Sequence, residues 1–368
     1  MQLSVNKSSS KQMKLKLVDG SEFAGRAFGA LREAQGEVVF NTGMTGYVET
    51  LTDPSYRGQI LVLTYPLQGN YGVPDGPFES ARIQVQGLIV ARHTDAFSHH
   101  AARRSLGAWL KAHDIPAMEA ADTRAITKHL RAEGTVLGRM SYDGVDGLSP
   151  AESVAMHSVI DLVSPAEMTS YPGGHLRILV IDTGIKESII RSLQQRGATV
   201  TRVPSRYPWE ELLAETDGIL LANGPGDPRE LQSLADRVRA SFVRRIPTLG
   251  ICLGHQVLAL AAGAKTFKLP YGHRSTNQPV MNIITHRCYI TSQNHGFAVD
   301  ENSLDTDWEP WMVNLNDGTN EGIRHRYLPF LSAQFHPEAN AGPNDTQFIF
   351  DDFVHMIETA ASSRRVQQ

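Results

Sequence analysis

The second half of the sequence alternates short apolar runs with helical patterns, and this alternation limits the fold more than any other feature. The run LRILVID (176–182) is followed by a helical pattern in KESIIRSLQQRG (186–197), and further pairs follow as far as residue 263. Continuous apolar runs are typical of strands buried on both faces, and strands separated by helices form parallel sheets that helices cover. We therefore predict an α/β unit at 175–362, with a mostly parallel sheet flanked by helices.

The first half has a different pattern. Residues 13–28 alternate polar and apolar side chains around Asp19-Gly20, a dipeptide that suits a two-residue hairpin turn. Later apolar segments indicate more strands, and the segments 99–114 and 122–134 have helical patterns. This half is predicted to be a mixed, β-rich α/β domain.

The domain boundaries follow from these changes of pattern. We predict an N-terminal domain at 13–146 and, because 147–174 is rich in Ser, Pro and Gly, a linker there. Residues 1–12 are expected to form a disordered leader, and 363–368 a tail. Two domains suit a chain of 368 residues.

Composition excludes several classes of partner. The formal net charge is only -4, so no global field favours nucleic acid or an anionic membrane. We also find no apolar run of about 18 residues that would span a bilayer. Only two cysteines occur, which is typical of a reducing compartment, and we predict a cytoplasmic protein without nucleic-acid or membrane partners.

The segment GICLGHQ (250–256) places Cys252 between two glycines and directly before an apolar helical run. Glycines allow a sharp strand-to-helix turn with an exposed residue at its apex, an oxyanion-binding amide after it, and a helix N-terminus that favours a thiolate. We predict that Cys252 is a nucleophile. The alternative is a small buried cysteine in a βα turn, and Cys288, in an alternating segment, is predicted to be such a core thiol.

The segment QFHPE (334–338) supplies a candidate base. His336 and Glu338 are two residues apart, so in an extended backbone they project to one face. The carboxylate can then orient the imidazole that activates Cys252. Chance occurrence of His-x-Glu is the alternative.

The segment NGPGDP (223–228) closes another predicted strand with a glycine turn. Gly224 and Gly226 would let backbone amides approach a ligand closely, and the alternative is an ordinary tight turn. Neither GxGxxG nor GxxxxGK[ST] occurs, so ATP chemistry is expected on another polypeptide. The other histidines look unspecialised, and no metal site is predicted.

Together, GICLGHQ, NGPGDP and QFHPE resemble the class I, or triad, glutamine amidotransferases. The first-half segment NTGMTGYVETLTDPSYRGQILVLTYPLQGNYG, with QNHGFAV in the second half, is similar to the small, glutamine-hydrolysing subunits of carbamoyl-phosphate synthetase. The resemblance covers nearly the whole chain, from Lys14 to about Ile357.

The resemblance implies a catalytic triad of Cys252, His336 and Glu338. It also implies a set of residues that bind L-glutamine: Gly43, Gly224, Gly226, Leu253, Gln256, Asn294, Gly296 and Phe297. The chain departs from the family pattern in several places: it has Gly43 for a usual serine, GHRSTNQPV lacks the common second glycine pair, and Gln278 and Asn344 replace usual histidines. These departures affect the expected glutamine affinity and coupling, not the triad.

The resemblance further implies hydrolysis of L-glutamine, through a cysteine thioester, to glutamate and ammonia. Ammonia would pass to a large synthetase subunit that makes carbamoyl phosphate from bicarbonate with ATP and magnesium, for arginine or pyrimidine biosynthesis or both. No cofactor is expected in this chain, and the first domain, including the loop from Tyr47 to Tyr56, is a candidate for docking the large subunit. Two alternatives are a stand-alone γ-glutamyl cysteine hydrolase of related fold and a regulatory subunit with an inactive site.

Overall fold

The computed structural model describes residues 11–120, 122–142 and 159–366. The chain divides into two compact units. The first contains residues 1–52 and 58–155, and the second contains 53–57 and 156–368. Most of the predicted leader and the first part of the predicted linker lie outside the described residues.

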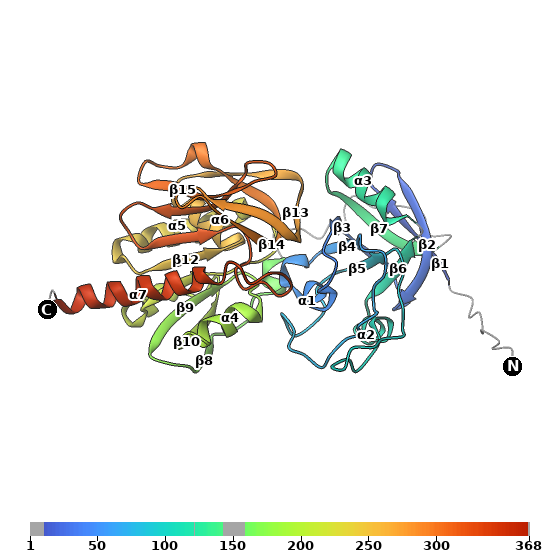
Figure 1. The fold of residues 1–368 in the computed structure, drawn as a ribbon, viewed down its shortest axis with the longest axis horizontal. Helices are drawn as coiled ribbons and strands as arrows, with labels where there is room; N and C mark the ends of the chain where they lie inside the picture. The colour runs from blue at the N-terminus through green and yellow to red at the C-terminus, as the bar shows by residue number, and fades with distance from the viewer. Residues whose placement is uncertain (1–10, 121, 143–158, 367–368) are drawn as a thin grey trace. The chain divides into compact units, whose positions relative to one another are not determined.

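The first unit is a closed barrel with the strand order β1-β2-β6-β5-β4-β3-β7 (Figure 1). Its strands are β1 (Gln12–Leu17), β2 (Glu22–Gly29), β3 (Ala34–Asn41), β4 (Gln59–Leu63), β5 (Gly87–Val90), β6 (Pro116–Ala120) and β7 (Val136–Tyr142). The hairpin predicted around Asp19-Gly20 is confirmed, because β1 pairs antiparallel with β2 across it. Closure removes exposed sheet edges, and side chains such as Leu15 and Val38 fill the interior.

The helices of the first unit are α1 (Tyr47–Thr52), α2 (Leu106–Ala112) and α3 (Thr123–Glu133). The α2 helix is shorter than the pattern at 99–114 predicts, because the hydroxyl of Ser105 accepts a hydrogen bond from the Ala108 amide and starts the helix there. Asp122 caps α3 in the same way through the Ala125 amide.

The second unit is a ten-stranded mixed sheet with the order β14-β13-β15-β16-β17-β12-β11-β9-β10-β8. Its strands are β8 (Thr169–Tyr171), β9 (Leu176–Asp182), β10 (Ala198–Pro204), β11 (Gly218–Leu221), β12 (Thr248–Ile251), β13 (Lys265–Asn282), β14 (Arg287–Asp300), β15 (Trp308–Asn314), β16 (Asn320–His325) and β17 (Phe330–Ala333). The central strands β17, β12, β11, β9 and β10 are parallel, as the alternating pattern predicts. The edge strand β8 lies within the predicted linker and pairs antiparallel with β10.

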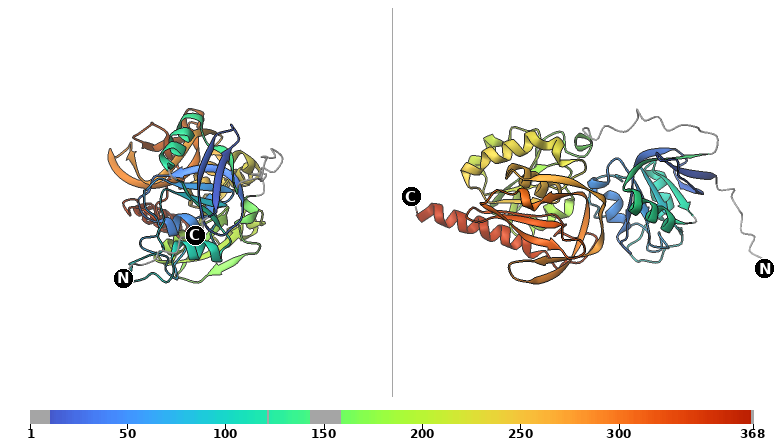
Figure 2. Two further views of the ribbon diagram at one scale, coloured as in Figure 1. Left: turned by 90° about the vertical axis from the view of Figure 1, so that its right-hand side faces the viewer. Right: turned by 90° about the horizontal axis from the view of Figure 1, so that it is seen from above.

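Helices cover both faces of this sheet (Figures 1 and 2). They are α4 (Glu187–Gln194), α5 (Gln232–Ser241), α6 (Leu253–Ala261) and α7 (Phe348–Val366). Alternation along β9 sends Val180 into a core with α4 and α7, and Leu179 into a second core with α5 and α6. Helices therefore support the parallel strands from both sides. Open α/β sheets bind their ligands at the carboxyl ends of such strands.

Short 3-10 turns connect these elements. They are η1 (Pro54–Tyr56), η4 (Ile160–Leu162), η5 (Trp209–Glu215), η6 (Pro228–Leu231), η7 (Phe242–Arg244) and η8 (Glu301–Ser303). The η1 turn is assigned to the second unit although its neighbours in sequence belong to the barrel.

Candidate active site

Cys252 forms the sharp turn between β12 and α6 that the glycine pattern predicts. Its φ of 53° is unusual for a residue with a side chain and indicates local backbone strain. The flanking glycines are sterically required. A Cβ added to Gly250 would lie 2.5 Å from the carbonyl oxygen of Gly254, and a Cβ added to Gly254 would lie 2.0 Å from the carbonyl oxygen of Leu221. Cys252 thus sits at the N-cap of α6, where the positive end of the helix dipole stabilises negative charge.

The expectation that the thiol is exposed was wrong. Only 2% of Cys252 is accessible, because β14 passes beside it and the thiol lies 3.7 Å from the Asn294 carbonyl oxygen. The turn raises the residue out of the sheet, but β14 covers it. Cys288 also differs from expectation: it is exposed, because it lies on β14 near the turn of the β13–β14 hairpin.

His336 reaches the cysteine from the neighbouring strand. Strands β12 and β17 are parallel, with Ile251 opposite Ala333, so the residues that follow them emerge at the same edge. A hydrogen bond from the Cys252 amide to the Ala333 carbonyl, 2.9 Å long, fixes this register. The structure thereby brings two residues that are 84 positions apart (336 − 252) to adjacent strand ends.

The imidazole of His336 is oriented by Glu338. Its Nδ1 lies 2.6 Å from Oε1 of Glu338, and both side chains are buried. Its Nε2 has no hydrogen-bond partner to nitrogen or oxygen among the described residues, while Cys252 interacts with the ring. This is the arrangement of a base held by a carboxylate and directed at a thiol.

Electrostatics favour a charged imidazole. Burial alone lowers the pKa of His336, but its interactions with Glu338 and Cys252 outweigh burial and raise this pKa to about 10. Burial raises the pKa of Glu338, but Lys186 and His336 outweigh it and lower this pKa to about 2. The folded chain therefore holds an imidazolium beside the thiol.

Lys186 is a member of this site that the sequence analysis missed. Its Nζ lies 3.0 Å from Oε1 of Glu338 and donates to the Ala339 carbonyl at 2.7 Å. Its side chain is only 4% exposed. The segment DTGIK carries no pattern that distinguishes this lysine from a surface residue, so only its burial beside a carboxylate identifies it.

The glycine turn after β11 lies beside this pair of strand ends, because β11 is the neighbour of β12. A Cβ at Gly224 would lie 2.1 Å from the Thr183 carbonyl oxygen, so the backbone there is tightly packed. At Gly226 the reason for glycine is different: φ is 104°, and no described atom lies within 4 Å of an added Cβ. The turn thus presents open backbone next to the elbow.

The other predicted glutamine-binding residues of the second unit fall on α6 and β14. Leu253 is the first residue of α6, and Gln256 lies one turn later. The Gln256 side-chain amide donates to the Phe297 carbonyl at 2.9 Å, which ties α6 to β14. Asn294 and Gly296 lie on the same stretch of β14, so these residues are gathered beside Cys252.

Gly43 belongs to the first unit, where its amide donates to Oδ1 of Asn41 at 2.6 Å. Its contact with glutamine stays a prediction. Of the other departures, Gln278 accepts a hydrogen bond from Asn316, and Asn344 accepts one from Gln347.

The η1 turn contributes side chains that the sequence analysis did not assign. The carboxylate of Asp53 accepts a hydrogen bond from the Asn294 side chain at 2.9 Å, and the Ser55 hydroxyl accepts one from Asn223 at 3.1 Å. Asp53 also caps the turn through the Ser55 amide. The Asp-Pro-Ser sequence signals a capped turn, but nothing in it signals where the turn packs.

Within residues 11–120, 122–142 and 159–366, no helix is long and apolar enough to cross a membrane.

Comparison with known proteins agrees with this geometry. Residues 15–140 match the family model described as carbamoyl-phosphate synthase small chain, CPSase domain, and residues 179–356 match glutamine amidotransferase class-I. The arginine-specific small chain of carbamoyl phosphate synthase from Yarrowia lipolytica is 45% identical, over 95% of this chain and 83% of its own length. The corresponding protein of Neosartorya fischeri is 44% identical, over 94% and 80%.

Two further similarities are partial. The multifunctional protein URA2 of Saccharomyces cerevisiae is 44% identical over 94% of this chain, which spans only 17% of that protein. A solved structure of a GMP synthase protein from Thermoplasma acidophilum, described as putative, is 26% identical with a TM-score of 0.44, covering 53% of this chain and 99% of that one.

Two conditions therefore coincide: a buried cysteine, histidine and glutamate at adjacent strand ends, and close similarity to small chains over most of their length. The chain belongs to the small-chain family of carbamoyl-phosphate synthase, with a class I glutamine amidotransferase domain as its second unit.

Proposed function

We propose that Cys252, His336 and Glu338 are the catalytic triad with which this glutamine-hydrolysing small subunit releases ammonia. The observation that carries the proposal is the orientation of His336. Glu338 takes one ring nitrogen at 2.6 Å, and the other has no hydrogen-bond partner to nitrogen or oxygen among the described residues, beside a thiol at a helix N-terminus.

In the first step the Cys252 thiolate attacks the side-chain amide carbon of L-glutamine. The carbonyl oxygen gains negative charge, which would be stabilised by the Leu253 amide and an amide of the turn from Gly224 to Gly226. The carbon–nitrogen bond then breaks, and the nitrogen leaves as ammonia with the proton of the His336 imidazolium. A γ-glutamyl thioester on Cys252 remains.

In the second step water replaces the thiolate. His336, now neutral, takes a proton from water as its oxygen bonds to the thioester carbon. The carbon–sulfur bond breaks, glutamate leaves, and the thiolate is restored beside the imidazolium. The balance is one glutamine and one water converted to one glutamate and one ammonia.

We propose that the substrate is held by the gathered residues on three sides of the thiol. The turn with Gly224 and Gly226, the start of α6 with Gln256, and the β14 segment with Asn294 surround it. Gly43 stays in this set as a prediction from the family resemblance.

The ammonia is proposed to pass to a large chain that binds ATP, magnesium and bicarbonate, so this chain needs no cofactor of its own. Sequestration has a physical reason, since ammonia in neutral water is mostly protonated and loses its nucleophilic lone pair. The barrel unit is the candidate docking surface. Tyr47 and Tyr56 are buried, however, so the docking loop would make contact through neighbours such as the exposed Met44.

A cytoplasmic location is also part of the proposal. Both cysteines are free, as in proteins of reducing compartments, and the mechanism needs the thiol of Cys252 reduced.

The decisive experiment replaces the nucleophile in the complete complex. Cys252→Ala is expected to lower glutamine-dependent carbamoyl phosphate synthesis by at least about 10³-fold and to leave synthesis from added ammonia unchanged. Cys288→Ala, at an exposed thiol, is the matched control and should leave both activities intact. Equal loss of both activities in Cys252→Ala would refute the catalytic assignment, whereas glutaminase activity that a large chain fails to stimulate would favour a stand-alone hydrolase.

A further inference from the structure

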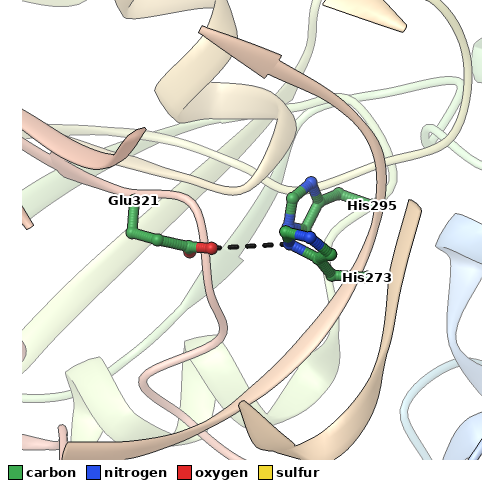
Figure 3. Close-up of side chains that lie close together, drawn as sticks. All are labelled: His273, His295 and Glu321. Carbon is green, nitrogen blue, oxygen red and sulfur yellow. Dashed lines mark ion pairs between the residues drawn. The ribbon is translucent and has the colours of Figure 1, made fainter. Parts of the chain in front are cut away.

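A second cluster of buried titratable side chains lies in the amidotransferase unit and contains no residue of the triad. His273, His295 and Glu321 come from β13, β14 and β16, and potential ligand atoms of the three lie within 4.8 Å of one another (Figure 3). None is more than 8% exposed. The sequence analysis took both histidines as unspecialised, because their clustering depends on three strands that meet only in the folded sheet.

His273 is held between two carboxylates. Its Nε2 lies 2.8 Å from Oδ2 of Asp317, and its Nδ1 lies 3.6 Å from Oε1 of Glu321. Burial lowers the pKa of His273, but these carboxylates outweigh burial and raise it above the ordinary value. The ring is therefore held between two carboxylates, one at each nitrogen.

His295 is the next ring in the cluster. The two imidazoles meet edge to face, with centroids 4.9 Å apart and planes at 85°. The Nδ1–H of His295 donates to the Phe297 carbonyl at 2.8 Å, and its Nε2 lies 3.1 Å from Oε1 of Gln293. A fixed His273 therefore restricts the orientation of His295.

The Phe297 carbonyl connects this cluster to the glutamine site. It accepts a second hydrogen bond from the Gln256 side chain, 2.9 Å long, and the same stretch of strand offers the Asn294 carbonyl to the Cys252 thiol at 3.7 Å. The β14 segment 293–297 thus contacts the buried cluster and, at the same time, the nucleophile and Gln256.

We propose that His273 is a positioning residue for the glutamine site: clamped by Asp317 and Glu321, it supports His295 and so fixes the Phe297 carbonyl and Gln256 where substrate binds. The inference deepens the proposed function and rests on it, because it takes glutamine as the substrate. His273 itself touches none of the reacting groups.

A metal ion is the other use of such a cluster, and one contact argues against it. The Asn314 side-chain nitrogen donates to Oε1 of Glu321 at 2.9 Å and lies 3.5 Å from Nδ1 of His273. An N–H donor thus lies beside one potential ligand atom of each of these two residues. Amide hydrogens and a cation repel each other, so the contacts favour a hydrogen-bonded clamp.

The test uses the full chain with a large chain present and compares His273→Asn with His286→Asn, an exposed histidine at the hairpin turn. His273→Asn is expected to raise the KM for glutamine about tenfold and to change kcat less than about twofold. His286→Asn should change neither. Asp317→Asn removes only the more exposed of the two carboxylates that hold His273, and it should raise the KM for glutamine by a smaller factor. This variant replaces His273→Asn in the test if His273→Asn does not fold.

The outcomes separate this inference from the proposed function. A wild-type chain without glutaminase activity would refute the function itself. With an active wild type, an unchanged KM in His273→Asn, or a fall in kcat alone, overturns only the positioning role. A chelator that raises the wild-type KM, with zinc restoring it, would also overturn the clamp and assign the cluster to a metal.

Discussion

Two fully buried histidines of the second unit, His336 and His255, show how little separates a base from a structural residue. Neither Nε2 has a nitrogen or oxygen hydrogen-bond partner among the described residues, although Cys252 interacts with the ring of His336. They differ in what faces Nδ1: Glu338 at 2.6 Å for His336, and the hydroxyl of Ser332 at 2.8 Å for His255. Burial lowers the pKa of His255 to about 3, whereas the interactions of His336 with Glu338 and Cys252 outweigh burial and raise its pKa to about 10.

The difference teaches that burial and a free nitrogen do not make an acid–base catalyst. Desolvation acts on both rings and favours the neutral form. Only His336 has a carboxylate to hold the charged form and a thiol to exchange a proton with. His255 follows Cys252 closely in GICLGHQ, so sequence distance alone would favour the wrong histidine.

The largest effect is expected from replacing His336, and it tests the difference between the two histidines directly. His336→Asn should lower kcat for glutamine hydrolysis by about 10³-fold or more, because the base and proton donor is lost. His255→Asn keeps a polar atom near the position of Nδ1, so it should reduce thermal stability but keep kcat within about tenfold. Steady-state kinetics and thermal unfolding of both variants provide the measurement. Similar losses of kcat in both would contradict the assignment.

Glu338→Gln removes the carboxylate beside His336, so that both histidines then face only uncharged polar groups at Nδ1. Without the carboxylate the pKa of His336 should fall, and kcat should fall by about 10²-fold, because the imidazolium no longer protonates the leaving ammonia. The downward limb of the pH–rate profile should move to lower pH. A variant whose profile matched the wild type would show that Glu338 does not hold the charged ring.

Glu338→Gln should also change how the stability of the fold depends on pH. The pKa of His336 is raised from 6.5 to about 10, so this contribution is full below pH 6.5 and is lost as pH rises through 10. The pKa of Glu338 is lowered from 4.5 to about 2, so its contribution is present above pH 4.5 and is lost as pH falls through 2. Unfolding temperatures of Glu338→Gln and wild type should therefore differ most between pH 4.5 and 6.5, and the difference should become smaller as pH rises toward 10.

Lys186→Met should have the smallest of these effects. The lysine lowers the pKa of Glu338, so its loss should raise that pKa and move the acid limb of the pH–rate profile upward. We expect a fall in kcat of roughly tenfold, less than for Glu338→Gln, because His336 still holds the carboxylate. The exposed Lys265→Met is the control. A larger loss than in Glu338→Gln would mean that Lys186 acts on the substrate instead.

The fold of the second unit was more predictable than that of the first. Runs such as LRILVID and the helical patterns between them depend on neighbours in sequence, so they predict a parallel sheet and its helices. The barrel depends on pairings such as β2 with β6 and β3 with β7, which join segments about 90 residues or more apart. Alternating patterns predict strands but not their partners.

Some features of the candidate site were also predictable from local sequence, and others were not. The elbow glycines and the His-x-Glu pair are local, and the structure supplies the steric reason for the first and the 2.6 Å contact for the second. The burial of the thiol was not predictable, because the covering residue Asn294 comes from a strand far along the chain. Asp53 was missed for the same reason: its contact with Asn294 spans 241 positions.

The sequence by itself determined the chemistry available to this protein, since a cysteine in a glycine elbow and an imidazole paired with a carboxylate follow from backbone sterics and side-chain spacing over a few residues. Only the tertiary structure decided which charges face each other. It places Lys186 on Glu338, Asp317 and Glu321 on His273, and a mere hydroxyl on His255. The physical reason is that a buried pKa depends on the few groups within several ångströms, and the folded sheet draws those groups from distant segments.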